Sequence, residues 1–167
     1  MTRTLAKRQH AVKLKRTAAG DAFSVLATLV LRLNGRLVAA GDALTAPAGQ
    51  TSARWMVLGS IKSESRSVAH IARVLCLTRQ SVQRVADLLE ADGLAEYEEN
   101  PNHLRAKLLK ITEQGLAALG VIQSAQRVWA NDVGGRIGET DLKQASAVLE
   151  RVFDVLEKTP PGRGRAK

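Results

Sequence analysis

Long runs of apolar residues at helical spacing stand near both ends of the chain. Over 21–38 the apolar positions recur on one helical face, which predicts a helix that ends near Gly41. A second run covers 112–133, where Gly134-Gly135 is expected to stop the helix. Thr140-Asp141 then begins a last helix with one apolar face.

Three further helical patterns lie between these runs, and each begins with a hydroxyl residue suited to a helix N-cap. Thr51-Ser52, Ser67 and Thr78 can accept hydrogen bonds from the first free amides of the helices that follow them. A tight connection at Cys76-Leu77 separates the second of these helices from the third. The third is expected to end at Gly93, which suits the left-handed conformation beyond a helix C-terminus.

Beyond Gly93 the pattern changes from helical to extended. Two short runs, 94–99 and 104–111, flank the turn signal Asn100-Pro101-Asn102-His103 and predict a β-hairpin. The expected fold is therefore mainly α-helical with a small β-hairpin wing. A short helix, a tight turn, a capped helix and a hairpin, in that order, describe a winged helix-turn-helix, whose second helix can enter the major groove of DNA.

The charge of the chain is concentrated at its two ends. The 167 residues include 25 Lys or Arg and 16 Asp or Glu, a formal net charge of +9 that favours a polyanionic partner. Residues 1–19 contain six of the basic residues and 158–167 contain four, without an acid, which leaves −1 on 20–157. We therefore predict a flexible basic N-terminal arm (1–19), a single folded domain (20–157) and a flexible basic tail (158–167).

The helix after Thr78 carries the side chains best suited to contact base edges. Once its inward apolar stripe is subtracted, the outward residues are Arg79, Gln80, Gln83, Arg84 and Asp87. Arg and Gln make paired hydrogen bonds to guanine and adenine in the major groove. Such a face can also be an ordinary solvated helix surface, but the capped helix, short turn and hairpin around it favour contact with DNA.

Between Leu44 and Gly115 the chain carries an ordered set of motifs: Trp55-Met56-Val57-Leu58, Val68-Ala69-His70-Ile71-Ala72, the runs 77–85 and 89–94, and the run 105–115. This set resembles the DNA-binding lobe of the MarR family of bacterial transcriptional regulators. The flanking helices match the family in order and length, so the resemblance covers about 21–157. It implies a winged helix-turn-helix over about 51–112 and a helical dimerisation region over about 21–40 and 113–157.

The resemblance also assigns DNA contacts to two elements. The family's recognition helix corresponds to 78–91, where Ser81 and Arg84 match positions that face DNA in relatives. The family's wing tip usually carries Asp-x-Arg, and here it is His103-Leu104-Arg105, so the arginine is kept without its acidic partner. We expect major-groove contacts from the recognition helix and minor-groove contacts from the wing, carried respectively by Arg79, Gln80, Ser81, Gln83 and Arg84 and by Arg105 with Lys107.

MarR-like proteins are dimers held by their first and last helices, which suits the long apolar faces of this chain. Two-fold symmetry would present the recognition helices to half-sites roughly 34 Å apart, and hence to a palindromic operator. Family members commonly repress transcription and release DNA when a small aromatic or phenolic effector enters a cleft. No ligand site is assigned here, because Trp55 and Met56 are expected in the core rather than in such a cleft.

Other chemistry finds no support in the sequence. Motifs of nucleophilic, metal-dependent or nucleotide-binding enzymes are absent, so we expect no catalysis, cofactor or metal site. The single cysteine, Cys76, excludes an intrachain disulfide, fits a reducing compartment and is interpreted as a small buried residue rather than a sensor thiol. The longest nearly apolar stretch, 23–31, is too short to span a bilayer, which favours a cytoplasmic protein without a membrane partner.

A different hypothesis makes the chain a sequence-indifferent nucleic-acid-binding or architectural protein, driven by its basic ends. Deleting 1–19 and 158–167 would then remove nearly all of its affinity for nucleic acid. A third and weaker hypothesis is a protein-interaction module.

Overall fold

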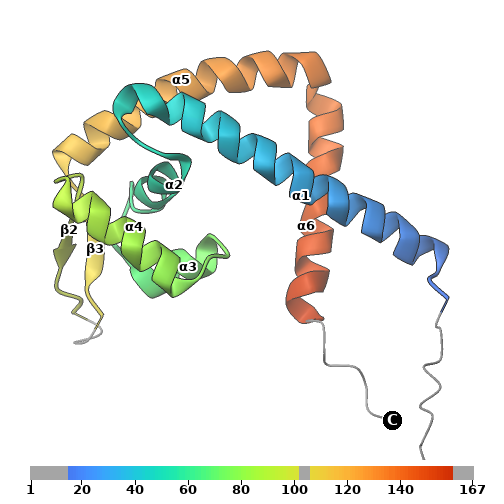
Figure 1. Ribbon diagram of the computed structural model, residues 1–167, viewed down its shortest axis with the longest axis horizontal. Coiled ribbons are helices and arrows are strands. Elements are labelled where there is room, and N and C mark those ends of the chain that lie inside the picture. Colours follow the sequence, from blue (N-terminus) through green and yellow to red (C-terminus); the bar gives the residue numbers. More distant parts are fainter. Residues whose placement is uncertain (1–14, 102–105, 160–167) are drawn as a thin grey trace, which may run out of the picture. The chain divides into compact units, whose positions relative to one another are not determined.

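The structure is a computed structural model that describes residues 15–101 and 106–159 (Figure 1). In chain order its elements are α1 (Ala18–Thr45), η1 (Ala46–Ala48), α2 (Ser52–Ser60), β1 (Arg66–Ser67), α3 (Val68–Val74), α4 (Arg79–Ala91), β2 (Ala95–Glu98), β3 (Leu108–Ile111), α5 (Glu113–Ile137) and α6 (Glu139–Lys158). The fold is mainly helical with a small antiparallel sheet, which confirms the predicted fold class. Two compact units divide the chain, one up to Ala40 and one from Gly41.

The described part of the first unit is dominated by α1, whose apolar side chains are largely exposed. Val25 and Leu31 are 71% and 74% exposed, and Phe23 and Leu33 are also open to solvent. By length and composition alone, the stretch 18–48 is long and apolar enough to cross a membrane. The expectation that the apolar stretch is too short to span was therefore wrong, because the helix continues well beyond 23–31. Core helices of soluble proteins pass the same test, so the finding is weak evidence of a membrane segment.

The first helix also continues past Gly41, where the sequence predicted its end. A Cβ on Gly41 would lie 2.9 Å from the Cβ of Ser52, so this buried glycine permits a close approach to the start of α2. Beside it, the carboxylate of Asp42 accepts a hydrogen bond of 2.8 Å from the Ser52 amide. Gly41 is therefore a packing position, and the helix ends at Thr45.

The predicted N-caps of the middle helices are confirmed. Thr51 accepts from the Arg54 amide at 3.3 Å, Ser67 from the His70 amide at 3.3 Å, and Thr78 from the Ser81 amide at 3.1 Å. Each bond satisfies an amide that has no partner within its helix. The end of α4 is also as predicted, since Gly93 takes a φ of +71°.

The wing is a three-stranded sheet in the order β1-β3-β2. The predicted hairpin is present as β2 and β3, with Ala95 opposite Ile111 and Tyr97 opposite Leu109. The sequence did not predict β1, in which Ser67 pairs with Leu108. Two residues are too few to show a strand alternation, so only the pairing with β3 defines this strand.

A single core joins α2, α3, α4, the root of the wing and α5. Its fully buried members include Leu58 of α2, Ile71 of α3, Leu89 of α4, Leu109 of β3 and Leu119 of α5. Trp55 packs against this core, as expected, whereas Met56 is 40% exposed and does not belong to it. The core fixes α4 between α2, α3 and β2, so that one face of α4 is buried and the other is free.

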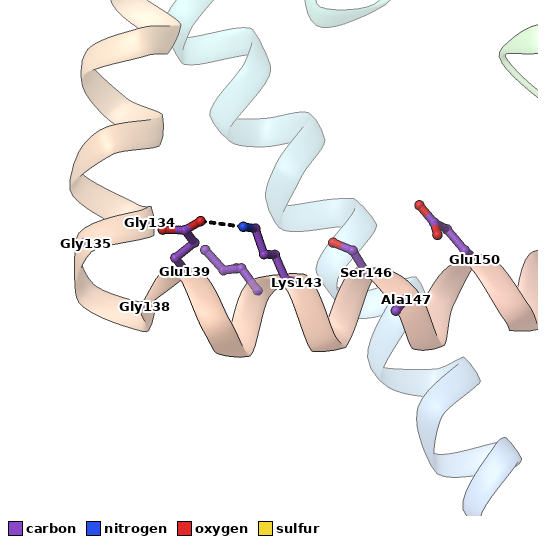
Figure 2. A pocket seen from close by; sticks show the side chains of 9 residues that line it. Gly134, Gly135, Gly138, Glu139, Lys143, Ser146, Ala147 and Glu150 are labelled. Carbon is purple, nitrogen blue, oxygen red and sulfur yellow. Dashed lines mark ion pairs between the residues drawn. The ribbon is translucent and has the colours of Figure 1, made fainter.

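The two C-terminal helices meet at a corner that lies later in the chain than the predicted helix end at Gly134-Gly135. The helix α5 runs through Gly134 and Gly135, although each glycine costs about 1 kcal/mol relative to alanine in a helix. It ends at Ile137, directly before Gly138, whose φ is +98°, and α6 begins at Glu139. A hollow of about 670 Å³ lies at this corner, and two of its lining residues, Glu139 and Lys143, form an ion pair of 2.5 Å. Figure 2 shows the side chains that line it.

Candidate nucleic-acid interface

The turn between α3 and α4 sets the direction of α4. The amide of Leu77 donates to the carbonyl of Ala72 at 2.9 Å, and Cys76 takes a φ of +54°. Left-handed backbone is uncommon for a residue other than glycine, and it reverses the chain here within a few residues. Cys76 is exposed, so its interpretation as a buried residue was wrong: the left-handed turn directs its side chain away from the core.

The face of α4 opposite the core carries the predicted contact residues. Val82, Ala86 and Leu89 form its buried stripe. The exposed side chains include the five residues that the sequence nominated on this helix, Arg79, Gln80, Ser81, Gln83 and Arg84. The periodicity therefore predicted correctly that Arg79, Gln80, Gln83 and Arg84 are exposed, and Ser81, nominated from the family resemblance, is exposed as well.

A groove of about 660 Å³ lies between α4, the start of α3 and the wing. Arg79, Gln80 and Gln83 line it from α4, and Lys107 lines it from the segment that leads into β3. Arg84 lies at a second hollow, shared with Gln80 and Gln83, on the outer side of the same helix. The structure thus brings most of the nominated residues together, from two elements far apart in sequence. Arg105 and His103 lie outside the described residues.

Three basic side chains at this surface are available to bind an anion such as a DNA phosphate. Within residues 15–101 and 106–159, no carboxylate forms an ion pair with Arg79, Arg84 or Lys107. Lys110, on the other face of the wing, differs: its Nζ lies 3.2 Å from Glu96 and 3.7 Å from Glu98, and the hydrogen bond to Glu96 raises the pKa of Lys110. The unpaired positive charge is therefore on the groove side of the wing.

The side chains of Ser81 and Gln83 already form hydrogen bonds within the protein, which the sequence did not indicate. The Ser81 hydroxyl shares a hydrogen bond of 2.7 Å with the hydroxyl of its N-cap, Thr78. The Gln83 amide nitrogen donates to Asp87 on the same helix and to Tyr97 on β2, each at 2.7 Å. Tyr97 in turn donates to Asp87 at 2.9 Å.

Sequence reasoning missed Tyr97. The extended pattern of 94–99 predicted a strand there but did not indicate that the Tyr97 hydroxyl reaches α4. Burial, and then its hydrogen bond to Asp87, raise the pKa of Tyr97 to about 12. The phenol therefore remains protonated at neutral pH and donates to the carboxylate.

A second contact holds the C-terminal end of α4. The Arg54 guanidinium of α2 forms an ion pair with Asp92 and donates to the carbonyl of Leu88 at 3.0 Å. A cation at this end of a helix meets the negative end of the helix dipole and the free carbonyls there. Thr78 at one end and Arg54 at the other thus anchor both ends of α4.

The described residues hold no cluster of metal-binding side chains. Among them, no three His, Cys, Asp or Glu side chains come together as a possible metal site. The grooves beside α4 are lined by cationic, amide, hydroxyl and apolar groups and by the carboxylate of Asp87.

A capped helix with exposed Arg and Gln side chains, held after a tight turn and beside a hairpin that carries Lys107, defines a winged helix-turn-helix DNA-binding protein. A family model described as MarR family matches residues 48–106. An uncharacterized protein of Mycobacterium tuberculosis is 34% identical over 141 residues, which cover 84% of this chain and 99% of that protein. The chain belongs to the MarR family; it is a DNA-binding transcription regulator and not an enzyme.

Solved structures share the fold at lower identity. A variant of MarR from E. coli complexed with operator DNA has a TM-score of 0.71 and 21% identity, over 79% of this chain and 96% of that one. CouR from Rhodococcus jostii, bound to p-coumaroyl-CoA, has a TM-score of 0.68 and 20% identity, over 76% of this chain and 90% of that one.

Proposed function

We propose that the protein is a homodimeric repressor that inserts α4 into the major groove of a palindromic operator. The observation that carries this proposal is that Arg79 and Arg84 are exposed on one capped helix and form no ion pair with a described carboxylate. Arg79 and Gln80 line a groove whose other wall holds Lys107, and Arg84 lies at the neighbouring hollow of the same helix. Arginine can bond guanine through two atoms, and glutamine can do the same with adenine. The likeness to MarR in complex with operator DNA supports this use of the fold.

In this proposal α4 and the wing contact different parts of the DNA. Arg79, Gln80, Gln83 and Arg84 contact base edges, and Ser81 meets the backbone at the start of α4. Lys107, with Arg105, holds the wing at the minor groove. The basic segments 1–19 and 158–167 follow the phosphates beyond this footprint, outside the domain 20–157.

The proposed dimer is supported by exposed apolar side chains, which a second copy of the chain would bury. On α6 none of the residues is buried, and Leu142, Leu149, Phe153 and Leu156 are between 37% and 49% exposed. Exposed apolar faces of this extent mark association surfaces. Sedimentation equilibrium should give twice the chain mass of 18.0 kDa; a monomer at micromolar concentration would remove the basis for a palindrome.

We further propose that a small aromatic or phenolic effector releases the DNA, and that the protein acts in the cytoplasm. CouR, which shares the fold, binds p-coumaroyl-CoA. A panel of phenolic acids and their thioesters, tested for release of a bound operator, checks this part. Release by none of them would leave a repressor that does not respond to this class of effector.

The decisive experiment is selection of bound duplexes from a random-sequence pool. We expect one enriched motif with two-fold symmetry. Arg84→Ala should then weaken binding to that motif by roughly 1–3 kcal/mol and relax the preference at one position of each half-site. Lys143→Ala, which removes an exposed cation on α6, is the matched control and should leave the motif unchanged.

The same experiment tests the alternative of a sequence-indifferent binder. The charge concentrated in 1–19 and 158–167 favours that alternative. A chain without both segments should keep its specific footprint if α4 carries recognition. Enrichment of no motif, together with loss of nearly all binding on deletion, would establish the sequence-indifferent function instead.

A further inference from the structure

Gln83, Asp87 and Tyr97 form a closed set of hydrogen bonds between α4 and the wing. The Gln83 amide nitrogen lies 2.7 Å from both Asp87 Oδ1 and Tyr97 Oη, and Tyr97 Oη lies 2.9 Å from the same Asp87 oxygen. Both α4 residues also line the outer hollow of that helix, and Tyr97 lines the groove beside it. The set therefore lies within the surface that meets DNA in the proposed function.

Chemistry fixes the direction of each bond. A carboxylate can only accept, so Asp87 takes one proton from the Tyr97 hydroxyl and one from Gln83. Having donated its only proton, the Tyr97 hydroxyl can only accept from Gln83. The Gln83 amide must therefore turn its nitrogen toward both partners, because its carbonyl oxygen would face two acceptors.

This arrangement uses both protons of the Gln83 amide. The amide oxygen, Oε1, remains available to accept a hydrogen bond, because no residue in the described part of the chain donates one to it. A free glutamine recognises adenine by donating to N7 and accepting from N6 together. A glutamine whose nitrogen is already held has only the accepting half of that pair.

The following inference rests on the proposed function. We propose that Asp87 and Tyr97 are positioning residues that determine base specificity. They hold the nitrogen of the Gln83 amide, so that Gln83 can contact DNA only as a hydrogen-bond acceptor. An acceptor selects the exposed amino groups of the major groove, cytosine N4 and adenine N6. It disfavours guanine and thymine, which present only acceptors at the corresponding places. Gln83 then behaves toward DNA as a neutral substitute for glutamate.

The wing takes part in this recognition without touching the base. Tyr97 belongs to β2, and β2 is paired with β3 along its length, so the position of the phenol follows that of the hairpin. A movement of the wing away from α4 would free one N–H of the Gln83 amide, while the other stays bonded to Asp87. Base preference at this position is thus coupled to the docking of the wing on α4.

Tyr97→Phe tests the proposal because it removes the hydroxyl and keeps the ring. Gln83 then regains one free N–H and can bond adenine through two atoms. In selection from random duplexes, we expect the wild type to accept cytosine or adenine at one position of each half-site. The variant should shift toward adenine, with the ratio of cytosine to adenine falling roughly tenfold.

Two further variants complete the test. Gln83→Ala should lose the preference for cytosine or adenine at the same position of the half-site, and this loss identifies the position that Gln83 contacts. Lys110→Gln is the control: it breaks the ion pairs to Glu96 and Glu98 on the other face of the wing and does not reach Gln83, so it should leave the preference intact. If Tyr97→Phe does not fold, Asp87→Ala frees the amide from the other side and should shift the preference in the same direction.

The outcomes separate this inference from the proposed function. No enriched motif in the wild type would overturn the function itself. A motif that is present in the wild type, and identical in Tyr97→Phe and Asp87→Ala, would overturn only the inference. A uniform loss of affinity at every position, with the base ratio at this position unchanged, would show a merely structural role for Tyr97 and would also overturn it.

Discussion

The carbonyl oxygen of Leu94 lies against the α-carbon of Gly115, so close that any side chain at position 115 would overlap it. The first residue after Gly93 therefore touches the first turn of α5. Two hydrogen bonds tighten the same junction: the Thr112 amide donates to Leu94 at 3.2 Å, and the Thr112 hydroxyl donates to Gly93 at 2.7 Å. The entry to β2 and the exit from β3 are thereby fixed to each other.

Gly115→Ala should destabilise the protein. The added methyl group would also meet Ile111 Cγ1 at 2.8 Å, and the neighbours are backbone and core atoms that cannot move freely. Overpacking of this kind costs roughly 1–3 kcal/mol, visible as a lower midpoint of urea unfolding. The matched control is Gly120→Ala in the same helix, where nothing lies within 4 Å of the new Cβ. It should stabilise by about 1 kcal/mol through helix propensity. Equal effects of the two changes would contradict the packing argument.

Thr78→Ala should loosen the start of α4. It removes the hydroxyl that accepts from the Ser81 amide at 3.1 Å and bonds the Ser81 hydroxyl. Loss of such a cap costs about 1 kcal/mol of unfolding free energy. Thr78→Ser keeps the hydroxyl and should restore most of that stability. A stability of Thr78→Ala equal to that of the wild type would show that the cap contributes nothing.

Tyr97 should titrate near pH 12. It is the single tyrosine of the chain, so phenolate absorbance reports it alone. Burial and Asp87 raise the pKa of Tyr97 from 10.0 to about 12, and both act by disfavouring the phenolate. Because the pKa is raised in the folded state, the neutral phenol stabilises the fold fully below about pH 10. That contribution is lost as the pH rises through about 12.

Two variants should move the Tyr97 pKa in opposite directions. Asp87→Asn removes the negative charge beside the hydroxyl and should lower the pKa toward 10. Gln83→Ala removes a donor that favours the phenolate and should raise the pKa further. A midpoint near pH 10 in the wild type would mean that in solution the Tyr97 hydroxyl is neither buried nor bonded to Asp87 as it is in this structure.

Lys107→Ala should reduce affinity for DNA evenly over all sequences. The side chain is exposed, and no described carboxylate pairs with it, so it is free to neutralise a phosphate. Loss of one such contact lowers the slope of log affinity against log salt by about 1. Arg84→Ala, by contrast, should relax base preference at one position. A change in base preference from Lys107→Ala would reverse the proposed division of roles between helix and wing.

Sequence alone predicted the features that depend on local chemistry. Hydroxyl N-caps at Thr51, Ser67 and Thr78, the left-handed Gly93 and the exposed face of α4 follow from short-range hydrogen bonding and periodicity. These features locate the helix-turn-helix and the predicted site residues on it.

What sequence could not predict depends on contacts between distant segments. Gly41 was expected to end a helix, but its lack of a side chain serves the approach of Ser52. Gly134-Gly135 was expected to do the same, whereas the helix stops where Gly138 takes a positive φ. The bonds from Gln83 to Tyr97 join residues 14 positions apart on different elements, and no local pattern indicates them.

The exposed thiol of Cys76 stands in the turn just before Thr78, the cap of α4, and it is the one cysteine in the chain. A maleimide dye can therefore be attached at one defined place in the native sequence, without removing or introducing any other cysteine. The dye would lie beside the element that approaches DNA, on a short segment whose backbone is anchored on both sides. Fluorescence from this label would follow operator docking and release in real time, one binding event after another.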